Sequence, residues 1–255
     1  MNATDSGSAV SRALAIIELI SAANKPLSIA DLTEQLELPK ATVHRVVMSL
    51  WHQGILQREP DSKRFAAGQR LTHLAIDALR NSAQRALRHA ILQGLVDHIR
   101  ETCNFNMMDQ NEIVYIDRVE ADWPLRVHFQ PGSRVPLHCT ATGKLFLSQL
   151  PPARRRRLIT TLNLKAHTPN TFIDPEHLEA ELLRIRAQKI GTDNEEFLAG
   201  LVAVAVPIHD RHNRICAALA VHGPIGRLSF EQALSHVPKL RTAAIQLSQT
   251  LFGKE

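Results

Sequence analysis

Cysteine is scarce in this sequence, and its spacing argues against two classes of stabilising site. The 255 residues include three cysteines, Cys103, Cys139 and Cys216, and no two of them form a C-x-x-C pair. An odd number of widely separated cysteines argues against a disulfide framework or a zinc site. Such cysteine usage is typical of a reducing compartment, so we expect a cytoplasmic protein.

Long apolar runs and leader sequences are also missing. The longest apolar run, Leu201 to Val206, is far too short to span a bilayer. The first segment, MNATDSGSA, lacks the apolar region of a signal peptide, and we expect a flexible tail there. We therefore expect no membrane partner.

The motifs of common enzyme classes are absent from the sequence. It contains no G-x-S-x-G, no P-loop and no G-x-G-x-x-G. His209 and His212 lie in a predicted turn without a completing carboxylate motif, which favours surface histidines over metal ligands. We expect no enzymatic activity, no cofactor and no metal site.

The segment from Ser28 to Gly68 has the pattern of a helix-turn-helix followed by a two-stranded wing. Ser28 is a typical N-cap for a short helix, and the chain turns through Glu37 and Leu38 before it restarts at Pro39. The apolar residues of the second helix fall at i, i+3, i+4 and i+7, and they are Val43, Val46, Val47 and Leu50. That spacing predicts one buried face.

The opposite face of this second helix is polar and basic. Its residues are Lys40, Ala41, Thr42, His44 and Arg45. Base edges in the major groove offer donors, acceptors and the thymine methyl group, which suit such a face. Short strands over 55–58 and 64–67 would form the wing, whose basic residues are Arg58, Lys63 and Arg64. We predict DNA contacts by these eight residues.

The charge distribution agrees with that prediction. Residues 40–70 hold six basic and two acidic side chains, whereas residues 1–39 hold two basic and five acidic ones. The net charge of the whole chain, +5, is compatible with a polyanionic partner. Two other interpretations stay open here: a small helical bundle with a solvated charged face, and a winged module used for protein contacts.

Helical patterns flank the segment on both sides. One is predicted over 10–22 and another over 85–101, the latter with Leu87, Ile91, Leu95 and Ile99 on one side. Between them lies a helix with a long apolar seam, formed by Leu71, Leu74, Ala75, Ala78 and Leu79. We expect this seam to pair with a second copy of the chain. The alternative is packing on the chain's own second domain.

The remaining pattern predicts an α+β domain with a mainly antiparallel sheet flanked by helices. Strands are expected over 105–108, 113–118, 125–129, 201–206 and 215–221. Helices are expected over 141–149, over 153–162, and from a cap at Asp174 to a closing Gly191. Ser229 and Gln232 have capping-box spacing for a last helical stretch, which Pro238 should break or kink.

A candidate anion site lies at the start of the predicted helix over 141–149. If Thr140 caps this helix, the backbone N–H groups of Ala141 to Gly143 are available to a carboxylate metabolite. The alternative is a well-capped helix that packs closely at Gly143. Both interpretations stay open.

Three other groups attract attention in the second half. Asp193, Glu195 and Glu196 lack a nucleophile or a metal-ligand set, so we interpret them as a solvated or ligand-gating loop. His222 directly follows an apolar strand, whose end can border a pocket. Residues 154–157, four arginines, are expected to form a solvated helix face, with a second phosphate-contacting patch as the alternative.

Taken together, these motifs resemble the IclR family of bacterial transcription regulators. The resemblance is carried, over nearly the whole chain, by VSRALAIIELI, LPKATVHRVVMSL, PLHCTATGKLFLS, GTDNEEFLAGLVAVAVPI and ALAVHGPIGRLS. It implies a winged helix-turn-helix over 1–68, a linker helix over 69–84 and a GAF-like effector-binding domain over 85–255. It also implies a homodimer, or a homotetramer, on double-stranded operator DNA, with a small-molecule effector.

The resemblance places the effector pocket at seven positions, Thr140, Ala141, Gly143, Asp193, Ala203, Ala220 and His222. Two departures accompany it. Glu37 occupies a turn position that is commonly glycine. Relatives that bind small keto acids tend to have cysteine near Ala203 and serines near Ala220 and His222, so a different effector is expected here.

The sequence thus favours an effector-responsive transcription regulator that does no covalent chemistry. The rival interpretation is an enzyme whose second domain turns over a small acid while the winged module serves only for assembly. That rival requires turnover that depends on Asp193, Glu195 or His222.

Overall fold

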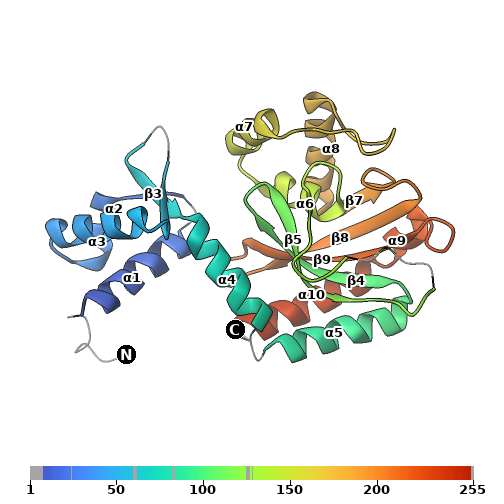
Figure 1. The fold of residues 1–255 in the computed structure, drawn as a ribbon, viewed down its shortest axis with the longest axis horizontal. Coiled ribbons are helices and arrows are strands. Elements are labelled where there is room, and N and C mark those ends of the chain that lie inside the picture. Colours follow the sequence, from blue (N-terminus) through green and yellow to red (C-terminus); the bar gives the residue numbers. More distant parts are fainter. Residues whose placement is uncertain are drawn as a thin grey trace. The chain divides into compact units, whose positions relative to one another are not determined.

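The structure is a computed structural model, and it describes residues 8–23, 25–59, 62–81, 84–124, 127 and 129–253. The chain divides into two compact units, Met1–Ala78 and Leu79–Glu255, which we call unit 1 and unit 2 (Figure 1). The division falls within helix α4 (Gln69–Asn81). Each unit has a hydrophobic core of its own.

Unit 1 is the predicted helix-turn-helix with its wing. Its elements are α1 (Ala9–Ala22), β1 (Leu27–Ser28), α2 (Ile29–Leu36), α3 (Lys40–His52), β2 (Leu56–Arg58) and β3 (Arg64–Ala67). The three strands form an antiparallel sheet in the order β1-β3-β2, and the sequence pattern did not predict β1. The predicted wing turn at residues 60 and 61 lies outside the described residues.

Local capping chemistry fixes the corner between α2 and α3. The Ser28 hydroxyl accepts from the Asp31 N–H while the Asp31 carboxylate accepts from the Ser28 N–H, which is a complete capping box. Glu37 ends α2 in the left-handed region, with φ of 52°. Pro39, which the sequence suggested as the first helical residue, is instead the N-cap of α3, so the helix begins one position later, at Lys40.

Unit 2 is an α+β domain with a six-stranded antiparallel sheet, as predicted. The strand order is β6-β5-β4-β9-β8-β7. Its strands are β4 (Thr102–Asp109), β5 (Glu112–Val119), β6 (Arg134–Pro136), β7 (Gly191–Asn194), β8 (Leu201–His209) and β9 (Ile215–Pro224). Its helices are α5 (Gln84–Ile99), α6 (Ala141–Gln149), α7 (Pro152–Thr161), α8 (Pro175–Gln188), α9 (Phe230–Ser235) and α10 (Val237–Phe252).

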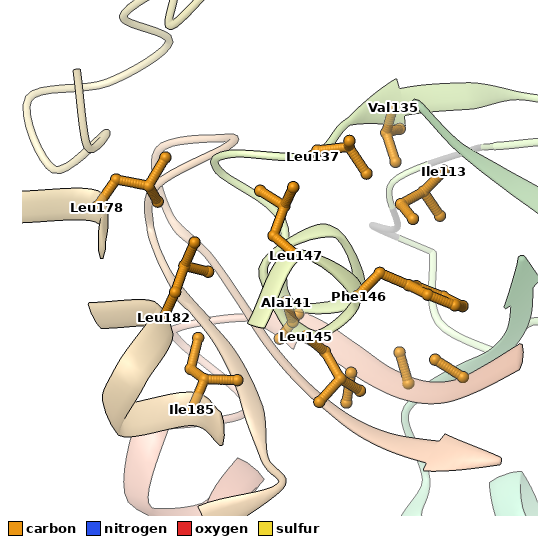
Figure 2. Close-up of a cluster of buried hydrophobic side chains, with 14 of the residues drawn as sticks. Ile113, Val135, Leu137, Ala141, Leu145, Phe146, Leu147, Leu178, Leu182 and Ile185 are labelled. Atoms are coloured by element: carbon orange, nitrogen blue, oxygen red, sulfur yellow. The ribbon is translucent and has the colours of Figure 1, made fainter. Parts of the chain in front are cut away.

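Helices cover both faces of this sheet. α5 and α10 contact each other and pack on one face, while α6 lies against the other face with α8 behind it (Figure 1). The α6 side chains fill the space between the two layers. In Figure 2, Leu145, Phe146 and Leu147 lie between the α8 residues Leu178 and Leu182 and the residues contributed by the sheet. α6 is therefore buried on all sides.

Several predictions for unit 2 were wrong in detail. The strand predicted over 125–129 is not found, since Val127 and Phe129 are not in a strand and the other three residues lie outside the described part. Leu87 is 61% exposed, whereas the neighbouring Arg88 is fully buried, so the buried face of α5 is offset from the predicted one. Lys189, not Gly191, ends α8 in the left-handed region. The strands β6 and β7 were missed.

The close packing of α6 yields a stability prediction. A Cβ atom added at Gly143 would lie 2.3 Å from the backbone oxygen of Leu137, whereas one added at Gly94 in α5 meets nothing within 4 Å. We expect Gly143→Ala to lower the free energy of unfolding by about 3 kcal/mol or more. The matched Gly94→Ala should raise it by about 1 kcal/mol through helix propensity. Urea unfolding followed by circular dichroism measures both, and equal stability of the two variants would contradict this packing.

Candidate functional site

The first candidate site is the outward face of α3. Lys40, Ala41, His44 and Arg45 are exposed, and Thr42 is half-buried. Val43, Val47 and Leu50 on the opposite side are buried in the core of unit 1. The predicted reading face is therefore not part of the protein's own interior.

The basic residues of the wing divide into two groups. Arg58 and Lys63 are exposed, and the Arg58 Nε donates to the Ser62 carbonyl at 3.3 Å. Arg64 instead points back to α2, where its Nη1 donates to Asp31 Oδ2 at 2.9 Å and to the Pro26 carbonyl at 3.0 Å. Arg64 thus holds the wing against the helix pair.

Asp31 takes part both in the ion pair with Arg64 and in the capping box of α2. The backbone N–H of Ser28 is the largest cause that lowers the pKa of Asp31, and the Arg64 charge contributes in the same direction. The carboxylate is therefore ionised at neutral pH and serves both as a cap and as an ion-pair partner. A single acidic side chain fixes the start of α2 and the position of β3.

The second candidate site is a small cavity between α6 and the sheet of unit 2, with a free volume of about 30 Å³. Six of the seven predicted effector residues line it, namely Thr140, Ala141, Asp193, Ala203, Ala220 and His222. The volume suffices for about two or three water molecules. An organic acid can enter only if the lining side chains move apart.

Gly143 does not line the cavity, because it sits one turn along α6 against Leu137. Its N–H donates to the Thr140 hydroxyl at 3.2 Å, and that hydroxyl donates to the Pro136 carbonyl at 2.6 Å. At Gly143 the closely packed cap is therefore the correct alternative. The N–H of this residue is already occupied.

Sequence reasoning missed the nine other lining residues, which are Asn104, Asn106, Ile113, Tyr115, Phe129, Val135, Thr142, Phe197 and Leu201. One signal was present for the two asparagines. They alternate with Cys103 and Phe105 in an otherwise apolar strand, so both asparagines point to the same face of the sheet. Polar residues at alternate positions of a buried strand indicate a polar cavity.

Arg118, Asn104 and His222 form a hydrogen-bonded group at one end of the cavity. The Arg118 Nη1 donates to Asn104 Oδ1 at 3.1 Å and lies 3.4 Å from His222 Nε2. The Asn104 Nδ2 lies 2.9 Å from His222 Nδ1. Burial first, and then the Arg118 charge, lowers the pKa of His222 from 6.5 to about 3, so the ring is neutral.

Both neighbours of this ring are hydrogen-bond donors. A neutral imidazole accepts at only one nitrogen, and the shorter contact assigns that role to Nδ1, with the proton on Nε2. Nε2–H and the Arg118 guanidinium then face each other as two donors. An anionic oxygen placed beside them would accept from both.

Two further polar groups border the cavity. Asn106 Nδ2 donates to the Thr142 hydroxyl at 3.1 Å, but its buried Oδ1 has no hydrogen-bond partner. Asp193 Oδ1 accepts from the N–H groups of Glu196 and Phe197 at 2.8 and 3.3 Å. Burial, and then the charge of Glu196, raise the pKa of Asp193 to about 7. The cavity thus contains a hydrogen-bond acceptor without a partner, Asn106 Oδ1, and the Asp193 carboxyl group, which is partly protonated at neutral pH.

The acidic loop is not solvated as one interpretation had it. Asp193 and Glu196 are buried, and Lys144 Nζ lies 2.6 Å from Glu196 and 3.3 Å from Glu181.

The four consecutive arginines on α7 differ in their exposure. Arg155 is buried in an ion pair with Glu179, while its three arginine neighbours are exposed.

Comparisons with known proteins find one family over both units. Residues 77–249 match the family model of the bacterial transcriptional regulator IclR C-terminal domain, and residues 9–60 match that of the IclR helix-turn-helix domain. The chain is 46% identical to the probable transcriptional regulator SauR of Cupriavidus necator, over 96% of this chain and 97% of that protein.

Two solved structures share the fold. The crystal structure of the Thermotoga maritima IclR has a TM-score of 0.63 and 27% identity, covering 96% of this chain and 98% of that one. A double mutant of the PobR inducer-binding domain from Acinetobacter, in complex with 3-hydroxybenzoic acid, has a TM-score of 0.61 and 27% identity. It covers 64% of this chain and 96% of that one.

The low pKa of His222 predicts an acid-sensitive fold. The unfolded chain takes up the proton near pH 6.5 and the folded chain only near pH 3, so acid favours unfolding between these values. Relative to His222→Gln, the wild type should lose about 1.4 kcal/mol of unfolding free energy per pH unit below pH 6. Urea unfolding at pH 4 to 7 measures this, with His212→Gln, an exposed histidine, as the control. If the unfolding free energies of the wild type and His222→Gln changed in parallel with pH, the low pKa of His222 would be contradicted.

Proposed function

Because the chain belongs to the IclR family of bacterial transcriptional regulators, we propose that it binds a specific operator and responds to a small carboxylate effector. The members of this family are transcriptional regulators, and we propose no catalytic step for this chain. α3 and the wing would contact DNA, and the cavity of unit 2 would hold the effector. Among the described helices, none is long and apolar enough to cross a membrane.

The observation that carries the DNA part is the exposure of the basic face of α3. Lys40 and His44 lie on it about one turn apart, and Arg45, the residue after His44, is exposed as well. Lys40 and the wing residues Arg58 and Lys63 would contact phosphates, which position the protein, while Arg45 and His44 would reach base edges. Arg64 contributes through the wing position rather than through its own charge.

We expect Lys40→Ala combined with Arg45→Ala to weaken operator binding at least about tenfold. The plot of log affinity against log salt concentration should become shallower by about one to two units, because fewer counterions are released. The measurement is electrophoretic mobility of a fragment from the region upstream of the protein's own gene, at several salt concentrations.

The matched control for this experiment is Arg154→Ala combined with Arg156→Ala. It removes the same charge from an exposed face of α7 in unit 2. Operator affinity and salt dependence should then stay at the wild-type values. Equal losses in both double variants would mean that the effect is one of net charge, and would overturn the α3 assignment.

The polar pattern of the cavity supports a carboxylate effector that also carries a hydrogen-bond donor. The carboxylate would accept from His222 Nε2–H and Arg118, and a hydroxyl would donate to the unpartnered Asn106 Oδ1. The PobR domain that shares this fold binds a hydroxy acid, 3-hydroxybenzoic acid. The small free volume favours a more compact acid here.

Dimerisation through α4 is part of the proposal. Leu74 is 54% exposed, and Ala75 and Ala78 on the same seam are exposed as well. Exposed apolar seams at helical spacing are suited to pairing with a second helix. A second copy would set the spacing of the two half-sites on the operator. An effector would change operator affinity only to the extent that it binds two dimer geometries differently.

A panel of small acids tests the effector proposal. We expect hydroxy acids such as glycolate and lactate to raise the melting temperature by more than acetate, propionate or the neutral amides do. Ala203→Val, which narrows the cavity, should abolish the shift, whereas Ala153→Val on the exposed part of α7 should not. Differential scanning fluorimetry gives the shifts. Amides that bind as well as acids would contradict the carboxylate assignment, and consumption of the acid would favour the enzyme rival.

A further inference from the structure

Two histidines and a cysteine lie together in unit 2, close to the effector cavity. His138 and Cys139 precede α6, and His167 belongs to the segment that joins α7 to α8. Each residue offers one ligand atom, and the three atoms all lie within 4.8 Å of one another. Sequence spacing could not indicate this group, because 27 residues lie between Cys139 and His167. The fold brings them together.

We propose that His138, Cys139 and His167 bind a divalent zinc ion. Imidazole and thiolate are the ligands that Zn²⁺ prefers, whereas Mg²⁺ and Ca²⁺ require oxygen ligands, which this group lacks. Three protein ligands leave a fourth position of the tetrahedron to water or to an oxygen of a bound ligand. This arrangement has the donor set of an open zinc site.

The geometry requires only a small adjustment. Tetrahedral zinc with bonds of about 2.0 to 2.3 Å needs ligand atoms roughly 3.3 to 3.8 Å apart, so an approach of about 1 Å closes the site. His138 and Cys139 are buried and held by the packed start of α6. The backbone near His167 is held by the Thr168 and Thr171 hydroxyls, which donate to the Glu196 carbonyl. The His167 side chain is exposed, so it is the ligand that can move by rotation.

His138 is prepared for ligation by its surroundings. Its Nε2 lies 2.9 Å from the Lys165 carbonyl oxygen, which only accepts, so Nε2 carries the proton and Nδ1 keeps a lone pair. A histidine ligand commonly donates its other N–H to such a carbonyl, which fixes the ring.

Charge at the site also favours a cation. The carboxyl groups of Asp193 and Glu196 are buried, and both act electrostatically on Cys139. Lys144 is the opposing charge, but it is engaged with Glu181 and Glu196. A zinc ion that displaces the thiol proton would place positive charge beside these carboxylates, which offsets part of the cost of ionising a buried thiol.

The site is connected to the wall of the effector cavity. The His167 ring packs on Phe197, with 5.4 Å between centroids, and Phe197 lines the cavity. Cys139 directly precedes Thr140 and Ala141, which line it as well. Zinc binding would therefore draw one wall of the cavity inward and alter its response to an acid.

The test is a titration of full-length, tag-free protein with Co²⁺, followed by displacement with Zn²⁺ in the presence of a chromophoric chelator. We expect one equivalent of metal, a thiolate-to-cobalt charge-transfer band, and the visible absorption of a tetrahedral ion. Cys139→Ser should abolish the charge-transfer band. His167→Ala should weaken metal binding at least tenfold, since even outer residues of metal sites have effects of that size.

Two controls and a second variant keep the result decisive. Cys216→Ser and His212→Ala remove a cysteine and a histidine outside the group, and both should bind metal as the wild type does. His167 is exposed, so His167→Ala retains the fold even if the buried Cys139→Ser does not. A wild type that shows no charge-transfer band, or binding unchanged in both site variants, would overturn the proposal. Neither DNA nor an organic acid is involved, so such a failure leaves the regulator proposal standing.

Discussion

Asp117 and Arg118 are adjacent in β5 and are buried on opposite faces of the sheet. The packing of much of unit 2 depends on the partners of these two charges. Asp117 accepts from Arg88 Nε at 3.0 Å, and Arg88 Nη1 also donates to the Leu79 carbonyl in α4. Arg118, the next residue, holds Asn104 and His222 beside the cavity. Removing one partner of a buried ion pair typically costs about 3 to 5 kcal/mol. The end of α4 and the cavity are thus attached to neighbouring positions of a single strand.

This arrangement gives a physical basis for a response to an effector. The cavity is nearly closed, and its polar groups are mismatched, with two donors facing each other and an acceptor without a partner. A ligand that supplies an anionic oxygen and a donor relieves both mismatches, but only in a widened cavity. Its binding energy therefore favours the widened arrangement over the closed one. Under the proposed function, Arg118 would take part in that rearrangement, and its neighbour Asp117 would transmit it through Arg88 to the end of α4.

The sequence determined those features that local chemistry fixes. The bounds of α6, the capping boxes at Ser28 and Ser229, and the break before Pro238 follow from cap residues and proline, which act within one turn. The misjudged features depend on partners distant in sequence. Arg88 can be buried on α5 because it forms an ion pair with Asp117, which lies 29 positions later in the sequence. Asp193 is buried because α6 covers β7. Six of the seven positions placed at the effector pocket by family resemblance line the cavity, whereas its asparagines required the strand register.

The winged unit illustrates how a charge that the sequence assigns to DNA contact can also have a structural role. Arg64 lies in the wing as expected, but its guanidinium is bound by Asp31 and the Pro26 carbonyl, so its charge is compensated within the protein. Lys40, Arg45, Arg58 and Lys63 are exposed, and under the proposed function they would offer the net positive charge to DNA. Asp31 meanwhile caps α2, so the ion pair connects the wing to the helix that precedes α3. If the exposed basic residues bind phosphates as proposed while Arg64 positions the wing, substitutions in the two groups would separate DNA affinity from the stability of the fold.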